Sequence, residues 1–347
     1  MSALICGSMA YDTIMVFHDK FKHHILPEKI HILNVSFLVP VMRREYGGCA
    51  GNIAYNLKLL GGDGLIMATV GHDFAPYQSW LQQHGIALEQ VQTIAAEFTA
   101  QAYITTDLDD NQITAFHPGA MNHAHLNRVG QAAGVRLGVV APDGRQGMIE
   151  HAAQFAAVGI PFLFDPGQGL PMYNGEELRA FITQANWVAV NDYEASMLAE
   201  RTGWSPEEIA ARVDALVVTR GGAGSWIYAK GTRHEIPPAK PQRVADPTGC
   251  GDAYRAGLLY GLQRGVDWPG TGRIASLAGA IKTIVVADAS IVDAVGYAER
   301  NTGAAKKNVV DVNDAAFLRS TGYSGLLRAE KKFGNTTFTS ITGYQSY

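Results

Sequence analysis

Short apolar runs alternate with helix-like segments along most of this chain, and this alternation constrains the fold more than any other feature. The apolar runs typical of buried strands are residues 4–10, 65–70, 137–142, 161–166, 187–191, 216–221 and 225–229. Helix-like segments lie between several of them, at residues 52–61, 146–159, 193–203 and 206–213. Strand, helix and strand in series predict a mostly parallel sheet with helices on both faces. We therefore predict an α/β fold with three layers, α/β/α.

Two segments interrupt this rhythm. Residues 13–45 contain a long extended stretch, and residues 97–117 are typical of two alternating strands joined by a turn. We predict that both form a small β lid over the sheet edge, because elements above such sheets often close active sites. Surface hairpins without such a role are the alternative. The α/β core then comprises residues 1–12, 46–96 and 118–347.

Composition excludes several classes of protein. With 347 residues, 47% of them hydrophobic, the chain can bury a sizeable core, and its net charge of -4 does not indicate a nucleic-acid binder. Its 3 cysteines are far apart, which fits a reducing compartment better than a disulfide framework. No apolar run is long enough to span a membrane. We expect a cytoplasmic protein without a membrane or nucleic-acid partner.

The end of the chain has a different composition from the rest. Residues 323–347 are rich in Gly, Ser, Thr and Tyr and have weak periodicity. We expect this tail to be peripheral or partly disordered.

Residues 246–252, Asp-Pro-Thr-Gly-Cys-Gly-Asp, stand directly before an apolar helix-like run. We expect a glycine turn with Asp252 opening the helix, so that the amides of residues 249–252 face outward. Amides at a helix N-terminus bind anions, phosphate in particular, and stabilise charge that develops in a transition state. The alternative is structural, because Asp is common in the first turn of a helix and glycines form turns.

A second glycine cluster, Gly47 and Gly48, precedes a helix start that has Asn52 in its first turn. Glycines let a ligand approach the backbone, and an amide side chain both donates and accepts, which suits hydroxyl groups. Asp12 follows the first strand, where a carboxylate can accept from two adjacent sugar hydroxyls. Helix packing and turn formation explain the same residues.

Two further polar groups follow later strands. Asn191 and Glu194 come after the run 187–191 at a spacing that places both on one side of a helix start. Their oxygens suit Mg²⁺ beside phosphates, often through water, and a helix cap with a capping box explains them equally well. Residues 219–224, Thr-Arg-Gly-Gly-Ala-Gly, form either a tight hairpin or a backbone cradle for a nucleotide.

Together these signals resemble the ribokinase-like (PfkB) family of sugar and nucleoside kinases over roughly residues 3–282. The matching patterns are G-G-x-x-x-N at 47–52, N-x-x-E at 191–194, T-x-G-x-x-G at 219–224 and the specific D-P-T-G-C-G-D at 246–252. A finer and less specific likeness to the nucleoside (adenosine) kinase branch is carried by residues 42–57, 111–121 and 164–170.

This resemblance implies a ribokinase-like fold and a chemical role for the glycine turn. Asp252 would be the general base that takes the proton from a ribose 5′-hydroxyl as it attacks the γ-phosphate of ATP. The amides of Gly249, Cys250 and Gly251 would form the anion hole. A purine or other nucleoside would be the acceptor, as in purine salvage.

The resemblance also implies which residues bind the two substrates. The nucleoside would be held by Asp12, Asn52 and the backbone of Gly47 and Gly48, with Phe116 stacking on the base and Gln168 contacting the nucleoside. ATP would contact Asn191, Thr219, Gly221, Gly222 and Gly224. Mg²⁺ would be organised by Asn191 and Glu194 through water.

Some features of the family are not legible in this chain. After Lys282 the pattern is lost, although relatives use this region for the adenine pocket and for a monovalent-cation site, such as one for K⁺. Asp246 and Thr248 would be half of such a site. A ribokinase- or fructokinase-like sugar kinase and a catalytically weak nucleoside-binding protein remain alternatives. The protein would be a monomer or a homodimer formed through the lid.

Overall fold

The computed structural model describes most of the chain. The described ranges are residues 2–25, 34–109, 111–239, 248–282, 308–311, 315–321, 324–333 and 336–345. In addition to the helices and strands below, short 3₁₀ helices are η1 (Phe21–His23), η3 (Gly119–Leu126), η4 (Val129–Gln131), η5 (Gly167–Met172) and η6 (Gly221–Ala223).

A nine-stranded sheet forms the centre of the molecule, in the order β13-β12-β11-β10-β9-β8-β1-β4-β5. Neighbours from β11 to β5 are parallel, and only the pairs β11–β12 and β12–β13 are antiparallel. The strands are β1 (Ser2–Cys6), β4 (Asp63–Gly71), β5 (Ala87–Ile94), β8 (Val135–Val140), β9 (Phe162–Phe164), β10 (Trp187–Asn191), β11 (Ala215–Thr219), β12 (Ser225–Ala229) and β13 (Thr232–Ile236). The prediction of a mostly parallel sheet is confirmed.

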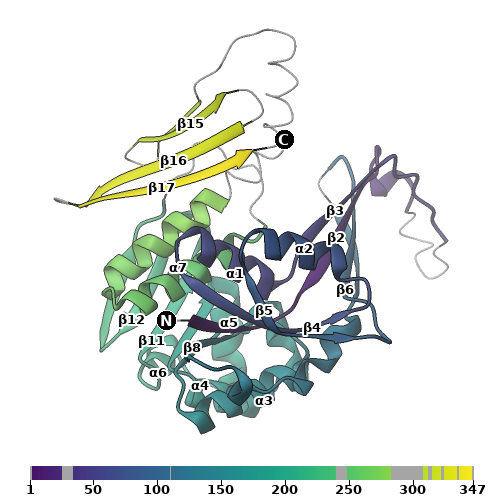
Figure 1. The fold of residues 1–347 in the computed structure, drawn as a ribbon. Coiled ribbons are helices and arrows are strands. Elements are labelled where there is room, and N and C mark those ends of the chain that lie inside the picture. The colour runs from purple at the N-terminus through teal and green to yellow at the C-terminus, as the bar shows by residue number, and fades with distance from the viewer. Residues whose placement is uncertain are drawn as a thin grey trace.

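Helices cover both faces of this sheet (Figure 1). Successive side chains of a strand point to opposite faces, and β1 shows the result. Ile5 packs in one apolar cluster with α1 (Cys49–Leu59), α2 (Ala75–Gln83), α7 (Cys250–Arg264) and the helix at residues 268–282. Leu4 packs in the other with α3 (Arg145–Val158), α4 (Gly175–Gln184), α5 (Asp192–Thr202) and α6 (Pro206–Ala210). The three-layer arrangement is therefore as predicted.

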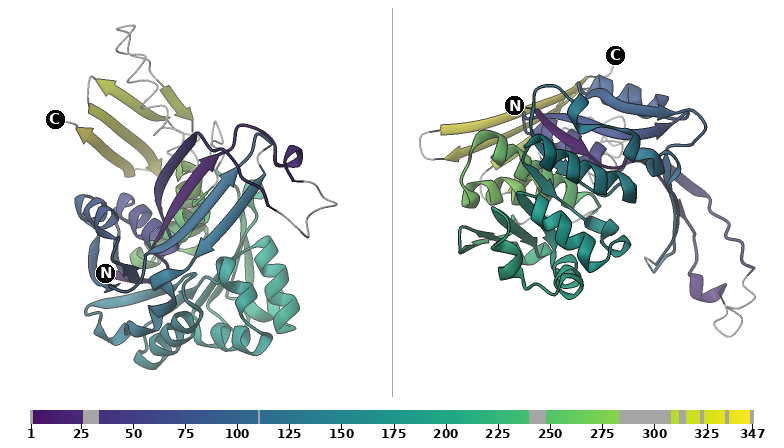
Figure 2. Two further views of the ribbon diagram at one scale, coloured as in Figure 1. Left: turned by 90° about the vertical axis from the view of Figure 1, so that its right-hand side faces the viewer. Right: turned by 90° about the horizontal axis from the view of Figure 1, so that it is seen from below.

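A smaller sheet stands beside the main one in the order β3-β2-β6-β7 (Figure 2). Its strands are β2 (Ala10–Val16), β3 (Val41–Gly47), β6 (Ala100–Thr106) and β7 (Gln112–His117). Both segments that we expected in a lid, 13–45 and 97–117, contribute strands. β2 and β3 also extend past those ranges to Ala10 and Gly47, so the Gly47–Gly48 pair joins this sheet to α1.

The C-terminal segment forms a separate antiparallel sheet in the order β14-β15-β16-β17. Its strands are β14 (Asn308–Asp311), β15 (Ala315–Thr321), β16 (Ser324–Phe333) and β17 (Thr336–Gln345). We expected residues 323–347 to be peripheral or partly disordered, and β16 and β17 occupy most of this range. The many Thr, Phe, Ile and Tyr residues of β17 explain this, because β-branched and aromatic residues favour strands.

Within the described residues, no helix combines the length and the apolar character that crossing a bilayer demands.

Candidate active site

Several of the candidate residues meet at one edge of the main sheet because parallel strands end together. β10 ends at Asn191 and β11 ends at Thr219, and these two residues are paired in register. β9 ends at Phe164, so Asp165 follows at the same edge. The N-termini of α1 and α7 complete this edge. The geometry of each residue there can be compared with the expectation from the sequence.

Asn52 of α1 and Asp252 of α7 are in direct contact. The Asn52 Nδ2 donates a hydrogen bond of 2.8 Å to the Asp252 Oδ2, across 200 residues of sequence. Burial raises the pKa of Asp252 to about 6, although the hydrogen bond from Asn52 opposes this rise. Asp252 is thus a stronger base than an ordinary aspartate and is still mostly ionised at neutral pH.

The glycine turn before α7 has the expected form, with one correction. We expected Asp252 to open the helix, but α7 begins at Cys250, with Gly249 as its N-cap at φ 76° and Asp252 in the first turn. The first hydrogen bond within the helix runs from Ala253 N to Gly249 O at 3.0 Å, so the preceding amides lie at the positive end of the helix dipole. Asp246, which we expected to share a cation site with Thr248, lies outside the described residues.

Asp12 lies in β2, against the glycine pair that ends β3. A Cβ on Gly47 would overlap the Asp12 carboxylate, and a Cβ on Gly48, at φ +90°, would lie 2.5 Å from the Ser8 carbonyl oxygen. Only glycine lets the chain pass this close to Asp12. Burial raises the pKa of Asp12, and the neighbouring Glu45 adds to this rise.

Phe116 shares a face of the small sheet with Asp12. Asp12 pairs with Ala102, and Ala102 pairs with Phe116, so the three side chains project from the same face. The Phe116 ring is 52% exposed. Gln168 is also exposed, in η5 after β9. Both side chains are therefore accessible to a ligand. The structure does not fix either of them as the hydrogen bond from Asn52 fixes Asp252.

Asn191 and Glu194 form the helix cap that was the structural alternative. The Asn191 Oδ1 accepts from the Glu194 amide and the Glu194 Oε2 accepts from the Asn191 amide, both at 2.7 Å. Burial raises the pKa of Glu194. Among the described residues, no group of three or more His, Cys, Asp or Glu side chains could hold a metal ion. The two side chains therefore cap α5, and their expected role in holding Mg²⁺ through water stays a prediction.

Residues 219–224 are a hairpin between β11 and β12, closed by a 2.8 Å hydrogen bond from Arg220 N to Gly224 O. Gly224 has φ +85° and leaves no room for a side chain. By contrast, a Cβ on Gly221 or Gly222 would meet nothing within 4 Å. The hairpin therefore presents an open backbone surface beside Thr219. The two alternatives for this segment, a tight hairpin and a backbone cradle for a nucleotide, are thus compatible with each other.

A buried ion pair near Asp252 was not predicted from the sequence. Arg255, one turn further along α7, donates from Nε and Nη2 to the two oxygens of Asp165, both at 3.0 Å. Both residues are at most 5% exposed, and Nη2 also donates to the Ala189 carbonyl at 3.3 Å. These hydrogen bonds join α7 to the end of β9 and to the middle of β10. The only signal in the sequence is a charged residue within an apolar helical run.

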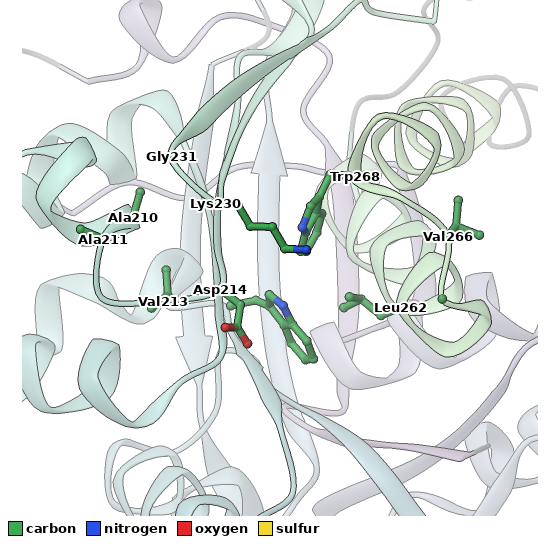
Figure 3. Close-up of a pocket in the computed structure, with 11 residues that line it drawn as sticks. Ala210, Ala211, Val213, Asp214, Lys230, Gly231, Leu262, Val266 and Trp268 are labelled. Atoms are coloured by element: carbon green, nitrogen blue, oxygen red, sulfur yellow. The ribbon is translucent and has the colours of Figure 1, made fainter.

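A cavity of about 510 Å³ lies at the opposite, amino edge of the main sheet (Figure 3). It is lined by Trp187 at the start of β10, by Asp214 just before β11 and by Lys230 just after β12. In Figure 3 the Lys230 side chain extends toward Trp268. None of the candidate residues lines this cavity. It is separate from the site at the carboxyl edge.

Comparisons with known proteins agree with this geometry. Residues 10–294 match the model of the pfkB family carbohydrate kinases. A nucleoside kinase from Methanocaldococcus jannaschii is 36% identical over 256 residues, which are 73% of this chain and 83% of that protein.

Solved structures give the same result. The nucleoside kinase of Burkholderia thailandensis in complex with inosine is 53% identical with a TM-score of 0.74, covering 81% of this chain and 90% of that chain. Its complex with ADP-inosine has a TM-score of 0.72 at 54% identity, covering 81% and 89%. The ribokinase of Thermotoga maritima, 18% identical with a TM-score of 0.68 over 81% and 92%, confirms the ribokinase-like fold. The chain therefore belongs to the pfkB family of carbohydrate kinases, which are ATP-using phosphotransferases with an alcohol group as acceptor.

Proposed function

We propose that this protein is an ATP-dependent nucleoside kinase that phosphorylates the ribose 5′-hydroxyl of a purine or other nucleoside. The observation that carries the proposal is the contact between Asn52 and Asp252 at the N-terminus of α7. It places a base of raised pKa beside a set of helix-terminal amides. The relatives named above support a nucleoside as the acceptor.

The chemical step needs little more than positioning and charge stabilisation. Asp252 takes the proton of the 5′-hydroxyl, the 5′-oxygen forms a bond to the γ-phosphorus, and the bond from that phosphorus to the β,γ-bridging oxygen breaks, which releases ADP. The negative charge of the transferred group faces the amides of Gly249, Cys250 and Gly251. Because burial raises the pKa of Asp252 to about 6, it is a better proton acceptor than an ordinary aspartate.

The acceptor site is divided between the two sheets. Asp12, Asn52 and the backbone of Gly47 and Gly48 hold the ribose hydroxyls. The exposed ring of Phe116 stacks on the base, in keeping with its place on the same sheet face as Asp12. Gln168 contacts the nucleoside from η5. Closure of the small sheet excludes water, which would otherwise accept the phosphoryl group.

The donor site lies on the hairpin after β11. ATP lies along the open backbone of Gly221 and Gly222, with Thr219, Gly224 and Asn191 beside it. Asn191 and Glu194 would hold Mg²⁺ through water beside ATP, where the ion would supply positive charge to the phosphates. A monovalent cation such as K⁺ near Thr248 is a further expectation. We place the enzyme in the cytoplasm and in purine salvage, as a monomer or a lid-paired dimer.

A substrate panel tests this proposal. ADP release from Mg·ATP is measured with adenosine, inosine, guanosine, cytidine, ribose and fructose, and the phosphorylated position is identified by phosphorus NMR. We expect turnover with nucleosides and a 5′-phosphate product. Turnover only with free sugars would show a sugar kinase. Nucleoside binding without turnover would show a binding protein on a kinase fold.

A further inference from the structure

The helix at residues 268–282 packs closely against α7 at three glycine positions. A Cβ on Gly261 would overlap Thr271, and a Cβ on Gly257 would overlap the backbone of Ala275. Nearer the active site, a Cβ on Gly279 would lie 3.3 Å from the carbonyl oxygen of Cys250. These approaches run along the two antiparallel green helices in Figure 1. The position of the second helix is therefore fixed closely relative to the glycine turn.

Lys282 lies three residues after Gly279, so it is on the same side of its helix. Its Cε is 3.2 Å and its Nζ is 3.9 Å from the point where a Cβ on Gly249 would stand. The Asn52 Nδ2, which holds Asp252, is 3.7 Å from the same point. Because Gly249 has no side chain, the Lys282 side chain can lie close to the N-terminus of α7.

Carboxylates at this edge outnumber the one guanidinium that lies among them. Asp252, Asp165 and Glu194 all interact with the single guanidinium of Arg255. Arg255 is bound to Asp165 through two hydrogen bonds, so its charge is already compensated. Within the described part of the chain, no carboxylate forms an ion pair with Lys282.

We propose that Lys282 is a further catalytic residue, whose ammonium contacts the phosphoryl group transferred from ATP. This inference rests on the proposed kinase function. The ammonium and the helix-terminal amides approach the group from two sides, and charge on its equatorial oxygens is stabilised without rearrangement. Lysine binds phosphate as a point charge, so it needs no fixed fork geometry. It transfers no proton, which remains the role of Asp252.

The test compares Lys282→Met and Lys282→Arg with Lys58→Met, which removes an exposed lysine from the far end of α1. We expect Lys282→Met to lower kcat about 100-fold, the cost typical of one lost transition-state donor. Lys282→Arg should recover part of this loss, and Lys58→Met should match the wild type. A kcat for Lys282→Met within about threefold of the wild type would overturn the role of Lys282 and leave the kinase function intact.

A binding measurement separates this inference from the kinase function. Calorimetry measures the affinity of wild type and Lys282→Met for ADP and for the non-hydrolysable analogue AMP-PNP. We expect the variant to lose roughly tenfold or more in affinity for AMP-PNP and to keep its affinity for ADP. The reason is that the substitution removes a charged hydrogen bond only at the γ-position. Equal affinities of wild type and variant for AMP-PNP would contradict the contact. If the wild type binds both nucleotides but phosphorylates no acceptor, the proposed function is wrong. The difference in AMP-PNP affinity between wild type and Lys282→Met still shows whether Lys282 contacts the γ-phosphate. If thermal unfolding shows that Lys282→Met is not folded, Lys282→Gln, which also removes the charge, carries the same comparison.

Discussion

The two edges of the main sheet carry different kinds of residue. At the carboxyl edge, Asp252 and Arg255 are charged groups whose partners lie on other elements. At the amino edge, the cavity of about 510 Å³ is lined by Trp187, Trp268 and short apolar side chains, with Asp214 and Lys230 at its surface. The cavity of about 510 Å³ thus lies away from the candidate site residues.

The difference follows from the direction of the strands. In a parallel sheet the carboxyl edge receives the N-termini of the following helices, so amides and caps accumulate there. The amino edge receives helix C-termini, such as the end of α7 at Arg264. A cavity of suitable size is therefore weaker evidence for an active site than the direction of the strands around it. Four experiments test whether the two edges differ in this way.

The largest difference is expected between Asp252→Asn and Asp214→Asn. The first removes the base, and general-base catalysis contributes about 10²- to 10⁴-fold, so kcat should fall by that factor. The second changes a carboxylate at the cavity and should leave kcat unchanged. Steady-state ADP release measures both, with thermal unfolding to show that each variant is folded. Equal losses of kcat in the two variants would refute the assignment of the chemistry to the carboxyl edge.

The next difference concerns stability. Asp165→Asn leaves the buried Arg255 without its main partner, and breaking a buried ion pair costs roughly 3–5 kcal/mol in the free energy of unfolding. Glu235→Gln breaks the exposed pair with Arg233 on β13 and should cost less than about 1 kcal/mol. Urea unfolding followed by circular dichroism gives both values. Similar midpoints would show that the Asp165–Arg255 pair does not hold α7 to the sheet.

The pH dependence should report Asp252. Burial raises its pKa to about 6, and the proton blocks its action as a base. kcat/KM should therefore fall about tenfold per pH unit below 6 and level off above it. The folded protein also binds this proton more tightly than the unfolded chain, so the contribution of Asp252 to stability should fall as the pH rises from about 4 to 6. Asp252→Asn should lack that fall, and a profile flat down to pH 5 would contradict the assignment.

The smallest difference is expected for aromatic side chains. Phe116→Ala should raise KM for the nucleoside about tenfold, because stacking on a base contributes roughly 1–3 kcal/mol. Trp187→Ala should leave KM unchanged and lower the melting temperature, since the indole packs against the core. Initial rates at varied nucleoside concentration decide between them. An unchanged KM in Phe116→Ala would place the base elsewhere.

The sequence predicts regular elements well where local patterns are strong. The runs 187–191 and 225–229 coincide with β10 and β12, because uninterrupted apolar residues suit strands that are covered on both faces. We made no prediction for α2 or β5. The α2 sequence is largely polar, and its helical period is weak.

The site residues were predictable one by one, but their contacts were not. Asp252 and Asn52 stand in recognisable patterns, yet nothing local shows that they share a hydrogen bond. The Arg255–Asp165 pair joins residues 90 positions apart, so it has no signature in either neighbourhood. Lys282 was noted only as the end of the family pattern. Long-range pairing depends on how helices pack, which one sequence does not show.

The glycines of the site and its exposed side chains differ in how freely they can vary. Gly48 and Gly249 have positive φ, which L side chains rarely adopt. A side chain on Gly48 would also collide with the backbone of residues 8–10. Both positions should therefore resist substitution. Phe116 and Gln168 are exposed, so substitutions there should cost little stability. A mutant library aimed at a new acceptor should therefore randomise these two positions first. Acceptor choice could then be redesigned without disturbing the phosphorylation chemistry.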